Sequence, residues 1–141
     1  MSSVSYTDVV KDLKQSYGEI NTIRDGKEIF KSESVYYGLH GSTIFIIGDN
    51  YQENEHVALC APKDLAPGKP HTVVYPDDFT NLPGDYLTWT IRVEDKRHYV
   101  EKGTLAVTFG PNKESAEGSY HVTLTGSGSE VGGNFKMSNA S

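Results

Sequence analysis

Cysteine is almost lacking from this chain, which has one copy, Cys60, in 141 residues. A single cysteine excludes an intramolecular disulfide and any zinc site built from several thiolates. Cys60 lies in the apolar stretch 56–61, without a neighbouring residue that would mark it as a nucleophile. We therefore expect a buried and unreactive thiol.

Long hydrophobic runs are also missing. The longest apolar run, Ile44 to Ile47, is far too short to cross a bilayer. Residues 1–14 contain no continuous apolar segment and no cleavage-site pattern. These features predict a soluble, cytoplasmic protein without membrane contact, unless a signal segment has been removed from the chain.

Positive charge is in deficit. The chain has 13 lysines and arginines against 19 aspartates and glutamates, so its formal net charge is −6. Proteins that bind nucleic acid neutralise phosphates with clustered basic side chains. The acidic balance therefore argues against nucleic acid and against anionic membrane surfaces as partners.

The residues that are abundant favour strands joined by tight turns. The chain has fourteen glycines and nine tyrosines, with 36% apolar residues. This length and composition predict one globular domain over residues 1–141, large enough to bury a core without a disulfide or a metal.

One helix is predicted, at the N-terminus. Val9, Val10, Leu13 and Tyr17 recur at the spacing of one helical face. Ser5 is placed to cap the first turn, which predicts a helix over residues 6–17.

The rest of the chain, residues 20–138, reads as strands. Asp25-Gly26 between short apolar arms predicts a hairpin. Residues 43–47 are apolar on both faces, which is typical of a central strand, whereas residues 86–93 alternate strictly between apolar and polar. Further strands are expected at 35–39, 55–61 and 71–75, followed by a C-terminal meander of three strands.

These expectations define the predicted fold class. We expect a mainly β protein, an antiparallel β-sandwich of about seven to nine strands with one short helix. A small up-and-down β-barrel is the alternative, because the C-terminal meander fits both architectures.

The C-terminal meander carries a loose resemblance. Glycine precedes three expected strand starts, at Gly103-Thr104, Gly118-Ser119 and Gly133-Asn134. This cadence resembles small β-sandwich domains of uncharacterised bacterial proteins. It covers only the meander and implies no functional residue.

The titratable residues form no recognisable catalytic or metal-binding pattern. The five histidines lack the spacing that would aim two imidazoles at one ion, and the acidic clusters lack the spacing of a calcium loop. A histidine from one strand could still meet Asp77 or Asp85 in the folded chain. The histidines are His40, His56, His71, His98 and His121, and the acidic clusters are Asp49, Glu53 and Glu55, then Asp77, Asp78 and Asp85.

The best candidate for binding is a sheet face rich in hydroxyl groups. Alternation places threonines on the polar side of residues 86–93 and of the C-terminal strands, with a tyrosine at the edge. Hydroxyls both donate and accept hydrogen bonds, although threonine also fills exposed strand positions without any ligand. The predicted ligand-binding residues are Tyr86, Thr88, Thr90, Arg92, His121 and Thr123.

The functional hypothesis is a non-enzymatic binding or protein-interaction module, with no catalytic residue, metal or cofactor expected. Its partner would be another protein or a small ligand such as a sugar, and an exposed edge strand could also pair two copies into a homo-oligomer. One alternative is a small-molecule carrier with a cavity inside a barrel. Another is a small hydrolase or isomerase with a histidine and an aspartate.

Overall fold

The structure is a computed structural model that describes residues 3–4, 15–50, 53–82, 86–93 and 96–139. Within these residues the backbone forms β-strands and short 3-10 helices, and it contains no α-helix. In chain order the elements are β1 (Ser3–Val4), β2 (Tyr17–Arg24), β3 (Lys27–Ser32), β4 (Val35–His40), β5 (Thr43–Asn50), β6 (Glu55–Pro62), β7 (Pro70–Tyr75), η2 (Asp77–Phe79), β8 (Tyr86–Leu87), β9 (Thr90–Val93), β10 (Lys96–Phe109), η3 (Pro111–Lys113), β11 (Ser115–Leu124) and β12 (Glu130–Ser138).

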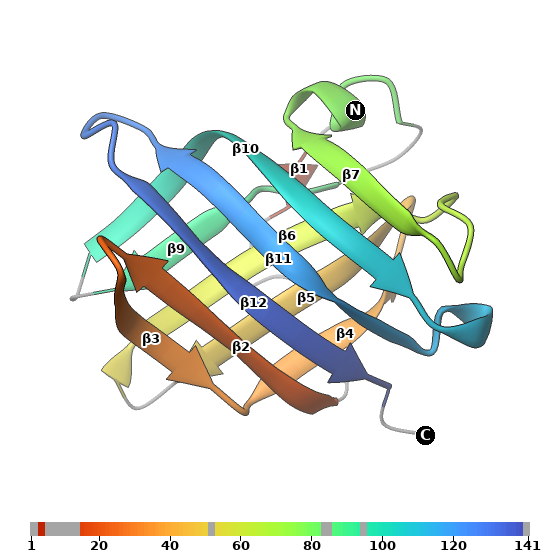
Figure 1. Cartoon of the computed structure of the whole chain (residues 1–141). Helices are drawn as coiled ribbons and strands as arrows, with labels where there is room; N and C mark the ends of the chain where they lie inside the picture. Colours follow the sequence, from red (N-terminus) through yellow and green to blue (C-terminus); the bar gives the residue numbers. More distant parts are fainter. Residues whose placement is uncertain (1–2, 5–14, 51–52, 83–85, 94–95, 140–141) are drawn as a thin grey trace.

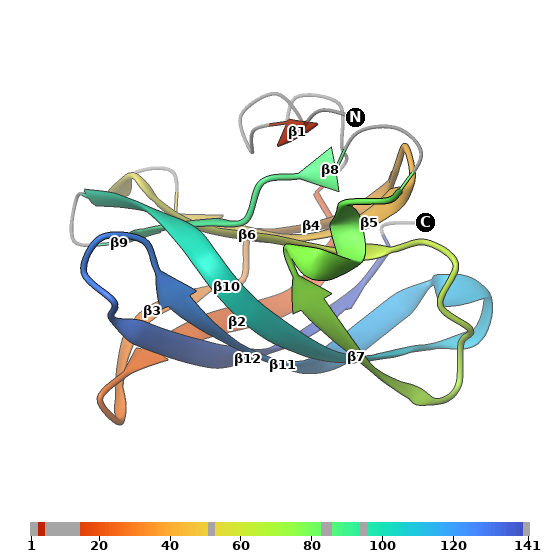
Figure 2. The same cartoon turned by 90° about the horizontal axis from the view of Figure 1, so that it is seen from above.

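Ten of these strands form one antiparallel sheet in the order β3-β2-β12-β11-β10-β9-β6-β5-β4, with β7 added beside β10. The long strand β10 belongs to two layers, because its first residues pair with β9 and its later residues pair with β7. The sheet therefore curls round until it is nearly closed into a flattened barrel, whose facing layers are seen in Figures 1 and 2.

The predicted sandwich is corrected by this topology. A sandwich has two separate sheets, whereas β10 carries a single sheet from one layer to the other, so the architecture is closer to the alternative barrel. The sequence was misleading at Gly103, which we expected before a strand start. Gly103 instead lies inside β10, and Gly118 and Gly133 likewise lie inside β11 and β12.

The barrel is closed along one seam by serine side chains in place of a full ladder. Ser16 bridges to β4: its N–H donates to the carbonyl of Val35 at 2.7 Å, and its hydroxyl accepts from the N–H of Tyr37 at 2.9 Å. Further along the seam, the Ser32 hydroxyl of β3 donates to the carbonyl of Asp49 on β5 at 2.5 Å, and the Ser34 hydroxyl donates to a carboxylate oxygen of the same residue at 3.0 Å. Asp49 is only 5% exposed, so its carboxylate has a structural role here.

The space between the layers is filled with side chains. A Cβ atom on Gly48 of β5 would lie 2.2 Å from Cγ2 of Ile20 on the opposite layer, so the two backbones approach closely. The Tyr120 hydroxyl crosses from β11 to β2, where it lies 2.6 Å from the Thr22 hydroxyl and donates to the carbonyl of Asn21 at 2.8 Å. Close packing of this kind is typical of protein cores.

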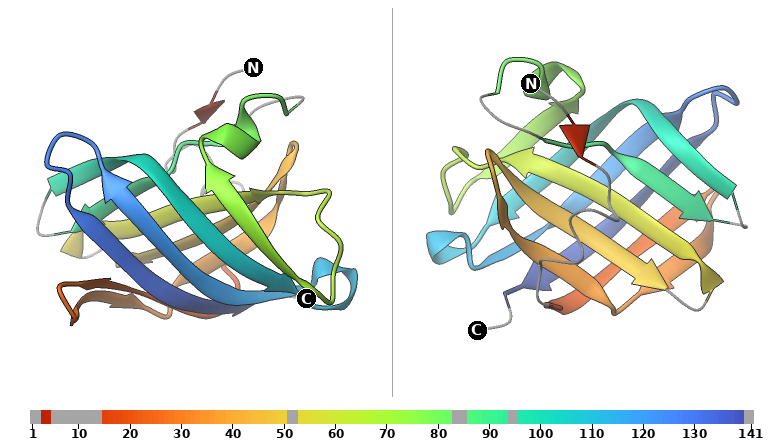
Figure 3. Two further views of the ribbon diagram at one scale, coloured as in Figure 1. Left: turned by 45° about the horizontal axis from the view of Figure 1, so that its top comes forward. Right: turned by 180° about the vertical axis from the view of Figure 1, so that it is seen from behind.

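The prediction of a central strand at residues 43–47 is confirmed, since β5 is buried on both of its faces. One face lies toward the barrel interior. The opposite face is covered in part by β8, which pairs in parallel with β1 on the outer side of this layer, as Figure 2 and the rear view in Figure 3 show.

Three local predictions have different outcomes. The Asp25-Gly26 hairpin is confirmed, because both residues have positive φ between β2 and β3. The predicted helix over 6–17 has no support: residues 6–14 lie outside the described residues, and Ser16 and Tyr17 are extended. The single strand expected at 86–93 is broken into β8 and β9 at Thr88 and Trp89.

Candidate functional site

The predicted ligand-binding residues fall into two separate groups. Thr90 and Arg92 lie on β9, whereas His121 and Thr123 lie on β11, on the other side of β10. Arg92 pairs with Arg97 of β10, and Thr123 pairs with Lys102, five residues further along the same strand. At about 3.4 Å per residue the two groups are offset by about 17 Å along β10. The structure therefore does not bring the six residues together.

The first group makes contacts within the protein. Thr90 is 7% exposed, and its hydroxyl lies 2.9 Å from Nε2 of His56. The Arg92 guanidinium donates through Nε to the carbonyl of Asn54 at 3.1 Å. The ring of Tyr86 stacks on Phe79, with 5.6 Å between the ring centroids. These contacts give the three residues structural roles in support of β6 and β8, and Thr88 between them is partly buried.

The second group lies on the outer face of the front layer. His121 is exposed and its Nε2 lies 3.8 Å from a carboxylate oxygen of Glu130. Its cross-strand neighbour Thr104 is exposed as well, and Thr123 is partly exposed. This face continues along β11 and β12 through Ser119 and Asn134, toward the end of the sheet where β11 begins and β12 ends.

A groove of about 820 Å³ lies at that end of the sheet, and it holds the candidate site. Sites for small ligands typically occupy about 300–1,000 Å³. The groove, called the strand-end groove below, crosses the last residues of β10 and β12 and the first residues of β11 and β2. Its lining is Gln15, Ser16, Tyr17, Gly18, Glu19, Glu33, Thr108, Phe109, Gly110, Ser115, Ala116, Glu117, Lys136, Met137 and Ser138.

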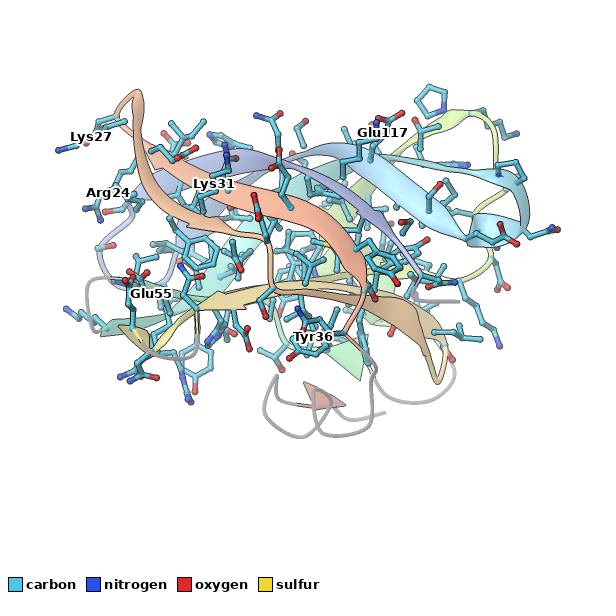
Figure 4. All side chains as sticks on the ribbon, turned by 90° about the horizontal axis from the view of Figure 1, so that it is seen from below. Arg24, Lys27, Lys31, Tyr36, Glu55 and Glu117 are labelled. Atoms are coloured by element: carbon cyan, nitrogen blue, oxygen red, sulfur yellow. The ribbon has the colours of Figure 1, made fainter. Side chains whose placement is uncertain are left out.

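Strand register brings the charged groups of the groove into one row. Glu117 pairs with Lys136, and Lys136 pairs with Glu19 on its other side. Glu19 also lies 3.9 Å from Nζ of Lys31. Figure 4 shows Glu117 and Lys31 on the outer side of their layer, away from the barrel interior. With Glu33 at one end, the lining has three carboxylates and one ammonium group.

Hydroxyl groups and one aromatic ring complete the groove. Ser115 pairs with Ser138, and Ser138 pairs with Tyr17, so that a second row of hydroxyls borders the charged row. Tyr17 is 63% exposed, the joint highest value among the large hydrophobic and aromatic side chains described. The arrangement offers several hydrogen-bond donors and acceptors beside one open aromatic face.

The groove was not predicted because its residues are distant in sequence. Tyr17 was assigned to the apolar face of a helix, and Glu19, Glu117 and Lys136 became neighbours only through the pairing of β2, β11 and β12. The one signal available was their position on the polar side of alternating segments, which many exposed residues share.

The other candidate groups lie away from the groove. Burial and the nearby charges of Arg97 and Arg92 lower the pKa of His56 from 6.5 to about 4, so the ring is neutral at pH 7. Asp78 accepts a hydrogen bond from the N–H of Val74 at 2.6 Å. Among the described residues, no three histidine, cysteine, aspartate or glutamate side chains are grouped as metal ligands.

Cys60 has the buried environment that the sequence predicted. Its side chain is fully buried, and burial raises the pKa of the thiol to about 12. Its Sγ donates to the carbonyl of Leu87 at 3.5 Å. A thiolate is needed for nucleophilic attack and for metal binding, so this position does not fit either role.

Neither the helices nor the comparisons with known proteins point to an identity for the chain. No helix in the described part of the chain is long and apolar enough to cross a membrane. Searches with family models, against curated proteins and against solved structures found no match to the chain. The geometry of the strand-end groove is therefore the feature from which a function can be inferred.

Proposed function

We propose that this protein is a non-enzymatic binding module that takes a polyhydroxylated small ligand, such as a sugar, in the strand-end groove. The observation that carries the proposal is the row of carboxylates and hydroxyls on β2, β11 and β12 beside the exposed ring of Tyr17. Carboxylates accept hydrogen bonds from hydroxyl groups strongly, because the acceptor is charged.

Preorganisation of the groove supports this proposal. Its charged row lies on paired strands, where Glu117, Lys136 and Glu19 hold a fixed register. A site on rigid strands loses little conformational freedom when a ligand binds. The strand register also places Lys136 between the two carboxylates as a donor between two acceptors, and opposite charges at directly opposed strand positions attract one another.

The alternative functions have less support in the described residues. A hydrolase would need a histidine that can exchange a proton near a cleft, whereas His56 is buried and His121 is outside the groove. A carrier would need an interior cavity, whereas the interior is packed with apolar side chains.

The test is a thermal unfolding assay of the purified protein against a panel of mono- and oligosaccharides. A ligand at about 100 times its dissociation constant should stabilise the folded state by about 2.7 kcal/mol. For a sugar that binds, we expect Tyr17→Ala and Glu117→Gln each to weaken binding about tenfold or more. His121→Ala is the matched control, because His121 is exposed on the same layer but lies outside the groove lining.

Two outcomes would contradict the proposal. One is the absence of any shift across the panel. The other is binding that is lost in His121→Ala and unchanged in Glu117→Gln, which would place the ligand on the β10–β11 face that the sequence predicted.

A further inference from the structure

A second, smaller pocket of about 360 Å³ lies at one end of the barrel, and none of its lining residues belongs to the strand-end groove. We call it the barrel-end pocket. It lies between the β4–β5 hairpin, the residues that follow β6, and the η3 turn. Its lining is Tyr37, Gly38, Leu39, Ile44, Lys63, Asp64, Asn112, Lys113 and Asn139.

One side of the barrel-end pocket is apolar. Leu39 and Ile44 are cross-strand partners at the end of the β4–β5 hairpin, and both line the pocket. Leu39 is 63% exposed, so a large aliphatic side chain stands open to solvent beside the hollow. Covering it with a hydrocarbon group would remove apolar surface from water, which favours binding.

Two lysines also line the barrel-end pocket. Lys63 and Lys113 both line the pocket, with Asp64 as the one carboxylate. The ammonium group of Lys113 donates to the carbonyl oxygen of Lys63, which holds the two residues side by side. An ammonium group has three donors, so Lys113 keeps the capacity to bind an anion. This local excess of positive charge stands against a net charge of −6 for the chain.

The backbone that presents Lys113 is held in an unusual conformation. Asn112 and Lys113 have φ values of 55° and 57°, a left-handed region that non-glycine residues seldom adopt. The turn is fixed from two sides: the N–H of Lys113 donates to the carbonyl of Gly110 at 2.9 Å, and its carbonyl accepts from the Tyr37 hydroxyl at 3.0 Å. Strained backbone of this kind is often found at binding sites.

We propose that the barrel-end pocket binds a small amphiphilic carboxylate, with its anionic end at Lys113 and Lys63 and its aliphatic chain over Leu39 and Ile44. The inference is independent of the proposed function, because it concerns another site and another ligand chemistry. Tight binding in the barrel-end pocket requires a negative charge and a hydrocarbon chain in the same molecule. Inorganic anions and neutral alcohols of equal chain length should both bind more weakly.

The experiment is a calorimetric titration of the full chain with octanoate, octylammonium and octan-1-ol, with amide chemical shifts to locate the site. We expect octanoate to bind most tightly, with shifts centred on the β4–β5 hairpin and η3. Lys113→Gln should weaken octanoate binding about tenfold, since loss of one charge-assisted contact has an effect of this size. Lys63→Gln provides a second variant that leaves the strained turn intact.

The matched control is Lys27→Gln, which removes the same charge from the exposed first residue of β3. It should leave octanoate binding unchanged. The proposal is overturned if octylammonium binds as tightly as octanoate, if neither Lys113→Gln nor Lys63→Gln weakens binding, or if none of the three compounds binds. Saccharide binding in the strand-end groove is measured separately, so failure of one site does not depend on the other.

Discussion

At the scale of the residue, His56 is a titratable side chain buried inside the protein. It lies on β6, is 4% exposed, and its Nε2 contacts the Thr90 hydroxyl. Burial and the guanidinium groups of Arg97 and Arg92 lower its pKa to about 4 in the folded state, against 6.5 for an ordinary histidine. The unfolded chain therefore binds a proton more readily than the folded chain between these pH values.

This difference predicts a loss of stability in acid. The contribution of His56 is fully present above about pH 6.5 and is lost as the pH falls toward 4, where protonation favours the unfolded state. The difference between the two pKa values of His56 corresponds to a change of about 3 kcal/mol at most in the free energy of unfolding, at 1.36 kcal/mol per pKa unit. Urea unfolding of the wild type and of His56→Gln at pH 7, 6, 5 and 4 measures it.

The comparison of the two proteins isolates the histidine from the carboxylates, which also titrate in this range. We expect the free energy of unfolding to fall less steeply with pH in His56→Gln than in the wild type. His121→Gln, at an exposed position, should keep the wild-type slope. Parallel curves for the wild type and His56→Gln would show that the imidazole is not buried as described.

At the scale of the element, β11 depends on a close approach between backbones. A Cβ atom on Gly118 would lie 1.8 Å from the carbonyl oxygen of Ala106 on β10, so only glycine fits without a shift of the strands. Gly118 lies inside β11, paired with Val107 and Phe135 on its two sides. The glycine therefore allows β10 and β11 to approach closely at this point.

We expect Gly118→Ala to lower the free energy of unfolding by about 1–3 kcal/mol or more, as overpacking does in other cores. Ser119→Ala is the control, because Ser119 is exposed at the next position, and it should change stability by no more than about 0.5 kcal/mol. Chemical unfolding of both variants measures the effect. Equal stability of the two variants would contradict the close approach of β10 and β11.

At the scale of the whole molecule, the barrel is unequally bonded around its circumference. β11 pairs along its length with both β10 and β12. Among the described residues, β3 forms a ladder only with β2, whereas β4 forms a ladder with β5 and one isolated backbone bridge, to Ser16, on its other side. The seam between β3 and β4 is therefore the weakest part of the closure.

Hydrogen exchange of the backbone amides should reveal this difference in bonding between the strands. We expect backbone amides of β3 and of the outer edge of β4 to exchange at least tenfold faster than those of β11, after correction for intrinsic rates, because fewer bonds must open. Asp49→Ala removes the acceptor of the Ser34 hydroxyl and should increase exchange at the seam more than in β11. Equal protection of all three strands would mean that the barrel opens only as a whole.

Much of the local structure followed from the sequence alone. Alternation of Leu87, Trp89, Ile91 and Val93 predicted which side of that segment would be buried, and all four are buried. The apolar run at 43–47 predicted a strand covered on both faces, and Asp25-Gly26 predicted a hairpin. These are consequences of side-chain period and turn chemistry, which depend on neighbouring residues only.

Only the tertiary structure decided the closure of the sheet and the location of the candidate site. Whether a strand begins only after Gly103 or already runs through it from a second layer depends on partners that lie elsewhere in the sequence, β7 and β9. The row of Glu117, Lys136 and Glu19 likewise exists only in the register of three strands. The side-chain period and the turn chemistry determined where each strand would form and which side it would bury. Long-range pairing decided which surfaces came together, because register is set between strands and not within them.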